Sequence, residues 1–413
     1  MKAQIILFAI IAMMRLSNGT VYVGGDFSSY IASNGSRIFV SAIGELLTSD
    51  ILQLGDGVDL QKQVSAISYL PQAPRCDRNC SSTQACLVTC VPGSDPALFI
   101  GGSFTIANGA EMYRISRITN GSMLETDKGV SNTVYSVQAH ETSGIVYYGG
   151  AFLDATGVPV GSVTSWDGKN WDQMGGGVSF PSTCDASGTQ PVKARNIAMW
   201  DPAAANGEGR WSSLCDSNPP NRCDIDGVSY RGTSAQAASP VYVFSLAYHA
   251  ASNMLYVGGL FQSAGQRYAN INSLAAFSLT SKSWSIVGGG IAGPSPVVHA
   301  LYISPGSQDL YVAGSFSAVG KQNSDVLSAG LNAGNIAVFS LTSGSWNTLN
   351  GGIPDADIRT VAVDGQTVYC GGKKLYTNQQ SGVIGIYKGD WSLIRTVNPS
   401  LFPSSPLLRP RLG

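Results

Sequence analysis

Four closely spaced cysteines are the sharpest chemical cluster in the sequence: Cys76, Cys80, Cys86 and Cys90. Four thiols at such spacing could bind a zinc ion, or they could form two disulfides. We favour disulfides, because the chain has an even number of cysteines, eight, and carries other signs of export. Nesting Cys76 with Cys90 and Cys80 with Cys86 would suit a hairpin, but three pairings within the cluster are open.

The other four cysteines are spread over the second half of the chain. Cys215 and Cys223 are the natural local pair. Their pairing leaves Cys184 to bond with Cys370.

Other residues that could do chemistry are few. Two of the three histidines, His140 and His249, each precede a glycine pair by nine residues, at Gly149 and Gly258. Equivalent repeat positions lie far apart in a ring, so a shared ion is not expected. The third, His299, sits in an alternating strand and is also interpreted as structural.

Known motifs give no further site. Asp224 to Gly227 resembles a calcium loop only faintly, because the remaining ligand positions do not follow. No nucleophile elbow, phosphate loop or paired carboxylates stand out. We therefore predict no catalytic residue, no cofactor and no metal.

The first residues predict export. Lys2 is followed by an apolar run, Ile5 to Met14, and small residues at Ser17 and Gly19 offer a cleavage point. We predict a signal peptide at 1–19; a short membrane anchor is the alternative, but the run has about half the length of a span. Glycosylation acceptors are expected at Asn34, Asn79 and Asn120.

Composition indicates a β-rich chain with many turns. The 413 residues include 49 glycines, only 12% are charged, and the net charge is −1. Exposed helical faces would need more Glu and Lys, and a near-neutral chain has no field that attracts nucleic acid. With 44% hydrophobic residues the chain can bury a core.

A repeated phrase organises the chain. It consists of an apolar residue, an aromatic residue, another apolar residue, two glycines, any residue and Phe, as in residues 21–27. Related copies begin at Leu98, Val146, Leu255 and Leu310, and a decayed copy at Val368. The later copies are followed by a strand that ends in an aromatic residue and then by a strand that opens with Trp, as at Trp284 and Trp346.

Repeat units of this length, with four short strands each, predict propeller blades. We expect an all-β β-propeller of seven blades, with six as the alternative count and a β-solenoid as the alternative fold. The expected boundaries are a propeller at 20–395, a Cys-rich insert at 71–96, an irregular region at 179–240 that has lost its glycine-pair strand, and a Pro-rich tail at 396–413.

The phrases resemble known repeats. A glycine pair followed by a spaced aromatic and Trp resembles the kelch repeat of galactose-oxidase-type propellers, although no residue set matches the copper ligands of that enzyme. The longer phrase, with Asn196 to Trp200 and the glycine cluster at 175–177, resembles ectodomain repeats of fungal cortical marker proteins. Those proteins mark growth poles and previous bud sites.

The resemblance implies a non-catalytic scaffold on the extracellular side of the cell surface, in the manner of a cortical polarity marker. Its partner would be a surface protein or a wall glycan, with no nucleic acid, and with a membrane only if an anchor is missing from this sequence. The alternatives are a secreted carbohydrate-active or oxidase-like propeller enzyme, and the C-terminally truncated ectodomain of a type I membrane protein.

Overall fold

The structure is a computed structural model. It describes residues 9–395 apart from 16–20, 27–28, 32–36, 40–41, 47–50, 54–56, 59–62, 80–86, 108, 120–121, 125–128, 142, 175–177, 180–181, 185–190, 193–196, 202–208, 215–227, 230–240, 266–267, 270, 305–307, 321–329 and 378–379. The expected acceptors Asn34 and Asn120, the cysteines Cys80, Cys86, Cys215 and Cys223, the segment 224–227 and the tail 396–413 lie outside the described residues.

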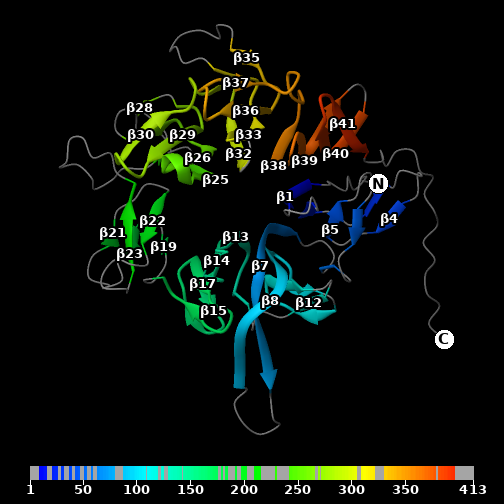
Figure 1. Cartoon of the computed structure of the whole chain (residues 1–413), viewed down its shortest axis with the longest axis vertical. Coiled ribbons are helices and arrows are strands. Elements are labelled where there is room, and N and C mark those ends of the chain that lie inside the picture. The colour runs from blue at the N-terminus through cyan, green and yellow to red at the C-terminus, as the bar shows by residue number, and fades with distance from the viewer. Residues whose placement is uncertain are drawn as a thin grey trace, which may run out of the picture.

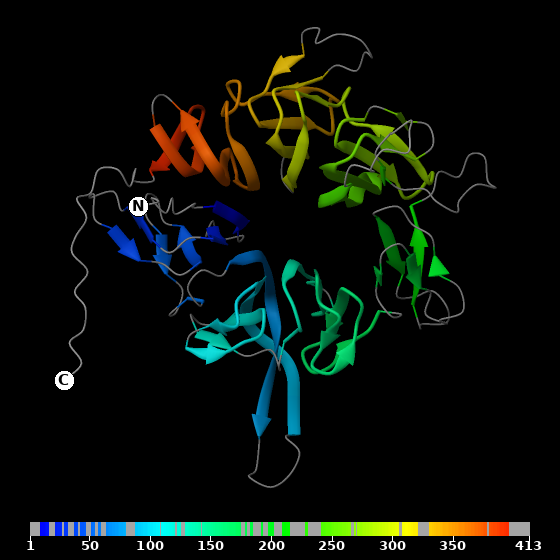
Figure 2. The ribbon, with the colours of Figure 1, turned by 180° about the vertical axis from the view of Figure 1, so that it is seen from behind.

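Six antiparallel sheets of four strands are arranged in a ring around one axis, so the chain is an all-β propeller (Figures 1 and 2). In every sheet the four strands neighbour one another in chain order, and the first strand lies nearest the axis. The ring excludes a β-solenoid.

The sheets are β1 (Ala9–Arg15), β2 (Val21–Asp26), β5 (Ile43–Leu46) and β6 (Ile51–Gln53); β7 (Val64–Asn79), β8 (Leu87–Gly102), β11 (Ile115–Thr119) and β12 (Ser122–Leu124); β13 (Val134–Ala139), β14 (Val146–Gly150), β17 (Val163–Trp166) and β18 (Trp171–Asp172); β25 (Tyr242–His249), β26 (Met254–Leu260), β29 (Leu274–Ser278) and β30 (Ser283–Ile286); β32 (Val297–Ser304), β33 (Asp309–Ser315), β36 (Ile336–Ser340) and β37 (Trp346–Asn347); β38 (Asp357–Asp364), β39 (Thr367–Thr377), β40 (Gln380–Tyr387) and β41 (Trp391–Arg395).

Smaller sheets and one short 3₁₀ helix, Ala250–Ser252, complete the described part of the chain. The sheets are β3 (Ser29–Ile31) with β4 (Arg37–Phe39); β9 (Ile106–Ala107) with β10 (Ala110–Glu111); β15 (Asp154–Ala155) with β16 (Val158–Pro159); β19 (Val178–Ser179), β20 (Ser182–Cys184) and β21 (Pro191–Val192); β22 (Ala198–Asp201) with β23 (Arg210–Ser213); β24 (Val228–Ser229), β27 (Ser263–Ala264) and β28 (Tyr268–Ala269); and β31 (Ile291–Ala292), β34 (Ala318–Val319) and β35 (Leu331–Asn332).

The region expected to be irregular holds a two-stranded sheet between the third and fourth of the six. In β22 and β23, Trp200 lies opposite Trp211, with ring centroids 5.3 Å apart. The same aromatic pair closes the outer edge of a regular sheet, where Phe277 lies opposite Trp284 at 5.1 Å. This hairpin therefore corresponds to the third and fourth strands of a repeat.

The repeated Trp side chains join neighbouring repeats by hydrogen bonds. Four of the five indole N–H groups donate to a main-chain carbonyl three or four residues beyond the Trp of the preceding repeat; Trp171 makes no such bond. The bonds are Trp211 to Met174 at 2.8 Å, Trp284 to Leu214 at 3.1 Å, Trp346 to Gly288 at 2.8 Å and Trp391 to Leu349 at 2.9 Å. Each of these four Trp side chains thus fills space between repeats and also satisfies its polar atom there.

The two positions of the glycine pair require glycine for different steric reasons. At Gly24, Gly101 and Gly258, a Cβ on the first glycine would collide with a side chain of the next sheet; at Gly101 it would lie 2.4 Å from Val134 Cγ1. Gly149 is the exception, since an added Cβ there would make no close contact. A Cβ on the second would collide with main chain of its own sheet: at Gly102 it would lie 2.0 Å from the carbonyl oxygen of Gln63. Only the first position can therefore accept a small side chain when the neighbour shifts, as Ala313 shows.

A residue with positive φ stands just before the third strand in five of the six four-stranded sheets; in the sixth, the residue just before β40 lies outside the described residues. Five non-glycine residues occupy this position: Ala42, Arg114, Ser162, Ser273 and Asn335, with φ of 61°, 70°, 68°, 66° and 67°. Their carbonyls accept the N–H of the second glycine of the phrase, as in Gly314 to Asn335 at 2.9 Å. The strained residue is therefore held by a repeated main-chain bond.

The Cys-rich insert extends β7 and β8 into a two-stranded arm that projects beyond the ring (Figure 1). Its register places Cys76 directly opposite Cys90, as the nested pairing requires. Asn79 ends β7. The disulfides themselves and the glycosylation of Asn79 stay predictions.

The expected bond between Cys184 and Cys370 is not formed. Cys370 is a free thiol, fully buried in β39, whereas Cys184 ends β20 in a different part of the ring. Burial raises the pKa of the Cys370 thiol to about 12, so it stays protonated. A bond between these two cysteines was expected because the other six were already assigned to pairs. That reasoning overlooks that a buried cysteine can serve as a small apolar side chain without forming a disulfide.

Candidate functional site

The histidines that share a repeat position are turn residues in different sheets. His140 Nδ1 lies 2.8 Å from Ser143 Oγ, and His249 Nδ1 lies 2.6 Å from Ser252 Oγ. His249 Nε2 also lies 2.6 Å from Gln308 Oε1 of the next sheet. Both rings are thus engaged in hydrogen bonds of the tight turn after the first strand.

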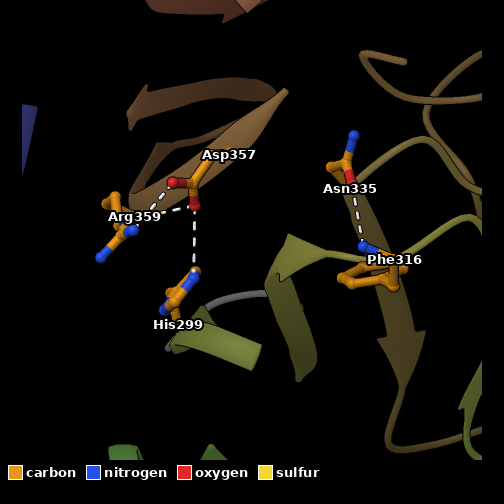
Figure 3. A network of polar contacts seen from close by, with 5 residues as sticks. All are labelled: His299, Phe316, Asn335, Asp357 and Arg359. Atoms are coloured by element: carbon orange, nitrogen blue, oxygen red, sulfur yellow. Dashed lines mark hydrogen bonds and ion pairs between the residues drawn. The ribbon is translucent and has the colours of Figure 1, made fainter. Parts of the chain in front are cut away.

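The third histidine takes part in a charged cluster near the ring axis (Figure 3). His299 Nε2 on β32 lies 3.2 Å from Asp357 Oδ1 at the start of β38. Arg359 donates two hydrogen bonds to the same carboxylate, from Nε to Oδ1 at 3.0 Å and from Nη2 to Oδ2 at 2.8 Å. The bidentate, charge-assisted contact between Arg359 and Asp357 lies within β38. The contact between His299 and Asp357 joins β32 to β38, and so links the last two sheets.

The Asp357 carboxylate is held in its ionised form. Partial burial works to raise its pKa, but hydrogen bonds from His299 and Arg359 and the charge of Arg359 outweigh that effect and hold the pKa far below its ordinary value. Asp357 is therefore a fixed negative charge at any physiological pH. Such a group is a poor general acid, which needs a pKa near the working pH.

We predict that Asp357→Asn lowers the free energy of unfolding by about 1–2 kcal/mol at pH 7. Because the folded pKa is depressed, the carboxylate stabilises the fold above its unfolded pKa of about 3.9, and this stabilisation is lost as the pH falls towards the folded pKa. Urea unfolding should show that the variant has a lower free energy of unfolding than the wild type at pH 7, and that this difference is smaller at pH 3. Asp355 is exposed, so Asp355→Asn serves as the control. A difference in the free energy of unfolding between the Asp357 variant and the wild type that is the same at both pH values would contradict a stabilising charge at Asp357.

Two exposed aromatic side chains extend the cluster onto the neighbouring sheet. Tyr242 and Phe244 on β25 are 48% and 45% exposed, and their rings stack at 5.5 Å with planes only 17° apart. Phe244 also contacts the His299 ring, with centroids 5.1 Å apart. We call Tyr242, Phe244, His299, Asp357 and Arg359 the axial arc, because all five lie on the strands nearest the ring axis.

A hollow of about 550 Å³ lies between the last two sheets. Asn335 lies in its lining, and its Oδ1 accepts a hydrogen bond from the Phe316 N–H at 2.8 Å (Figure 3). Its Nδ2 donates to the Ile353 carbonyl, also at 2.8 Å. Ala356, which also lines the hollow, directly precedes Asp357. The lining of the hollow and the axial arc thus meet in the sequence at Ala356 and Asp357.

Sequence reasoning found only His299 of the axial arc and assigned it no role. The missed signal is a three-residue pattern at the start of each first strand, in which a β-branched residue and a small residue flank a variable one. The variable residues are Ser65, Tyr135, Phe244, His299 and Arg359. Variation at one position of an otherwise fixed repeat is what a recognition surface would show.

Comparison with known proteins gives one family. Residues 229–400 match the model of the Rax2 C-terminal beta propeller domain. This segment contains the whole axial arc and the hollow. No curated protein sequence matches the chain.

Two solved structures resemble the chain weakly. They are described as the extracellular domains of a hybrid two component system and of a one component system, both from B. thetaiotaomicron, and both are 8% identical to this chain. The first match covers 94% of this chain and 38% of the solved chain, with a TM-score of 0.39. The second covers 95% and 35%, with a TM-score of 0.37. The chain therefore spans little more than a third of either.

Two other types of site are missing from the part of the chain that the structure describes. Three or more His, Cys, Asp or Glu residues nowhere gather there as metal ligands would. Nor does that part contain a helix with the length and apolarity to cross a bilayer.

Proposed function

We propose that this chain is a non-catalytic interaction scaffold on the extracellular side of a cell surface, with the role of a cortical polarity marker. The observation that carries the proposal is the match of residues 229–400 to the Rax2 C-terminal propeller, because the matched segment contains the one described surface that combines exposed aromatics with a fixed charge pair.

The ligand class follows from the axial arc. Stacked rings of Tyr242 and Phe244 offer a flat apolar face, on which a sugar ring can lie. Asp357 and Arg359 are 31% and 37% exposed, so their free lone pairs and N–H groups can still meet hydroxyls. An apolar platform with a few convergent polar groups is typical of a small-ligand site. We therefore propose a wall glycan as the ligand.

The proposal is tested by co-sedimentation of the purified full chain with insoluble β-glucan and with chitin. The double variant Tyr242→Ser with Phe244→Ser is expected to bind at least about tenfold more weakly, a loss of about 1.4 kcal/mol. Tyr135→Ser is the matched control, because Tyr135 is 60% exposed at the equivalent place of β13, away from the arc. It should bind like wild type.

Three outcomes would overturn the proposal: no binding of wild type to either glycan, equal binding by the double variant, or release of sugar from the glycan by the wild-type chain. Binding lost equally in the Tyr135 variant would show a general stability effect and would also count against the axial arc as the site.

A further inference from the structure

Strand β1, at the start of the described chain, reproduces a detail of the other first strands. It pairs antiparallel with β2, and its register shifts between Ile10, opposite Gly25, and Ala12, opposite Gly24. The extra residue of this bulge, Ile11, is left without a partner in the ladder. The bulge therefore stands directly against the glycine pair.

The same shift occurs at the same place in the other five four-stranded sheets. In each, a β-branched residue faces the second glycine and a small residue faces the first glycine or its replacement. The shifts lie between Val64 and Ala66, Val134 and Ser136, Val243 and Ser245, Val298 and Ala300, and Ile358 and Thr360. Residues 10–12 fit this pattern in both register and residue type.

The β-branched residue of the bulge joins one sheet to the preceding one. Val298 Cγ1 lies 2.4 Å from where a Cβ of Gly258 would stand, and Leu301 lies beside it. Val134 with Val137 does the same at Gly101. First strands thus insert a pair of apolar side chains, three residues apart, into the space that the glycine of the preceding sheet leaves free.

The register positions of that pair in β1 are held by Ile10 and Met13, and the preceding sheet in the ring is the last one. Strand β1 contacts both β38 and β39, as β32 contacts β25 and β26 (Figure 2). Gly371 of β39 is the first glycine of the last pair. The two ends of the ring therefore meet with the same arrangement of strands that joins its other sheets.

We propose that Ala9–Arg15 is the permanent first strand of the first blade, closes the ring against the last blade, and stays in the folded protein instead of being removed as part of a leader. An apolar leader needs hydrophobicity alone, whereas this segment also carries the β-branched, variable and small residues at the places that the bulge requires. The proposal is independent of the ligand. With Ala9–Arg15 retained, the extracellular location in the proposed function requires export without removal of residues 1–19.

The test compares Ile10→Asp with Ile11→Asp in the full chain. Ile10→Asp would place a carboxylate at the register position that the other sheets fill with valine or isoleucine, and it is expected to lower the Tm of the purified protein by about 5 °C or to prevent its folding. Ile11→Asp should change the Tm by less than about 1 °C, because the equivalent position carries Ser65, His299 and Arg359 in other sheets. Mass spectrometry of the folded wild-type protein should find residues 9–15 present.

A removed leader predicts a different pattern. Both substitutions would then reduce export alike, and the mature protein would begin near Ser17 to Thr20 with a Tm that neither substitution changes. That result, or equal destabilisation by both substitutions, would overturn the proposal.

Discussion

Replacing Gly314 by alanine is expected to lower the free energy of unfolding by about 3 kcal/mol, although its neighbour Ala313 is already an alanine. A Cβ at Gly314 would lie 2.0 Å from the carbonyl oxygen of Val297 and 3.0 Å from the Cα of Val298. Those are main-chain atoms of the bulge, so relief requires the paired strands β32 and β33 to separate locally.

The matched control is Gly149→Ala. Gly149 is the first glycine of its pair, and the nearest atom to an added Cβ is Ser136 Cβ at an ordinary 3.9 Å. Because alanine also restricts the unfolded chain, this change should be neutral or stabilise by up to about 1 kcal/mol. Urea unfolding of both variants gives the comparison; a Gly314 variant as stable as the Gly149 variant would contradict the packing described for the repeat.

Replacing Trp284 is the second change with a large expected effect. Trp284 is 2% exposed, packs on Phe277 and donates its N–H to the Leu214 carbonyl of the preceding repeat. Trp284→Ala should cost about 3–5 kcal/mol through the cavity that it leaves. Trp284→Phe should cost about 2 kcal/mol, because the ring is smaller and the Leu214 carbonyl loses its partner.

Trp171→Phe isolates the hydrogen bond from the packing. The Trp171 ring contacts Tyr148 and Trp166, but its buried Nε1 has no hydrogen-bond partner. Its replacement should therefore cost at least about 1 kcal/mol less than Trp284→Phe. Thermal and urea unfolding of the two Phe variants measure the difference, and equal losses would show that the indole bonds between repeats contribute little.

Much of the fold could be predicted from the sequence, because the packing of the sheets strongly restricts which residues can occupy the repeated positions. Glycine at the second place of the pair is imposed by main-chain contact, as at Gly314. Trp at the start of a fourth strand is favoured by the hydrogen bond from its indole N–H to a carbonyl of the preceding repeat, as at Trp391. Such residues mark strand positions unambiguously, so they predicted a propeller.

The site was harder to predict because it lies where the repeat is free to vary. Phe244 and Arg359 occupy the variable place of the bulge, and neither belongs to a motif with its own chemistry. Their proximity to His299 arises only when successive first strands meet around the axis. The leader at 1–19 stays a prediction, since an apolar run gives the same signal in a leader and in a buried strand.

First strands, each bulged against a glycine pair, hold neighbouring sheets together around a closed ring, and a crystal structure of the full chain tests this most directly. We expect it to show Ala9–Arg15 paired with Val21–Asp26 beside β38 and β39, and the Trp391 indole bonded to the Leu349 carbonyl. An open gap between the first and last sheets, with the axial edge of Val21–Asp26 unpaired, would contradict the closed ring.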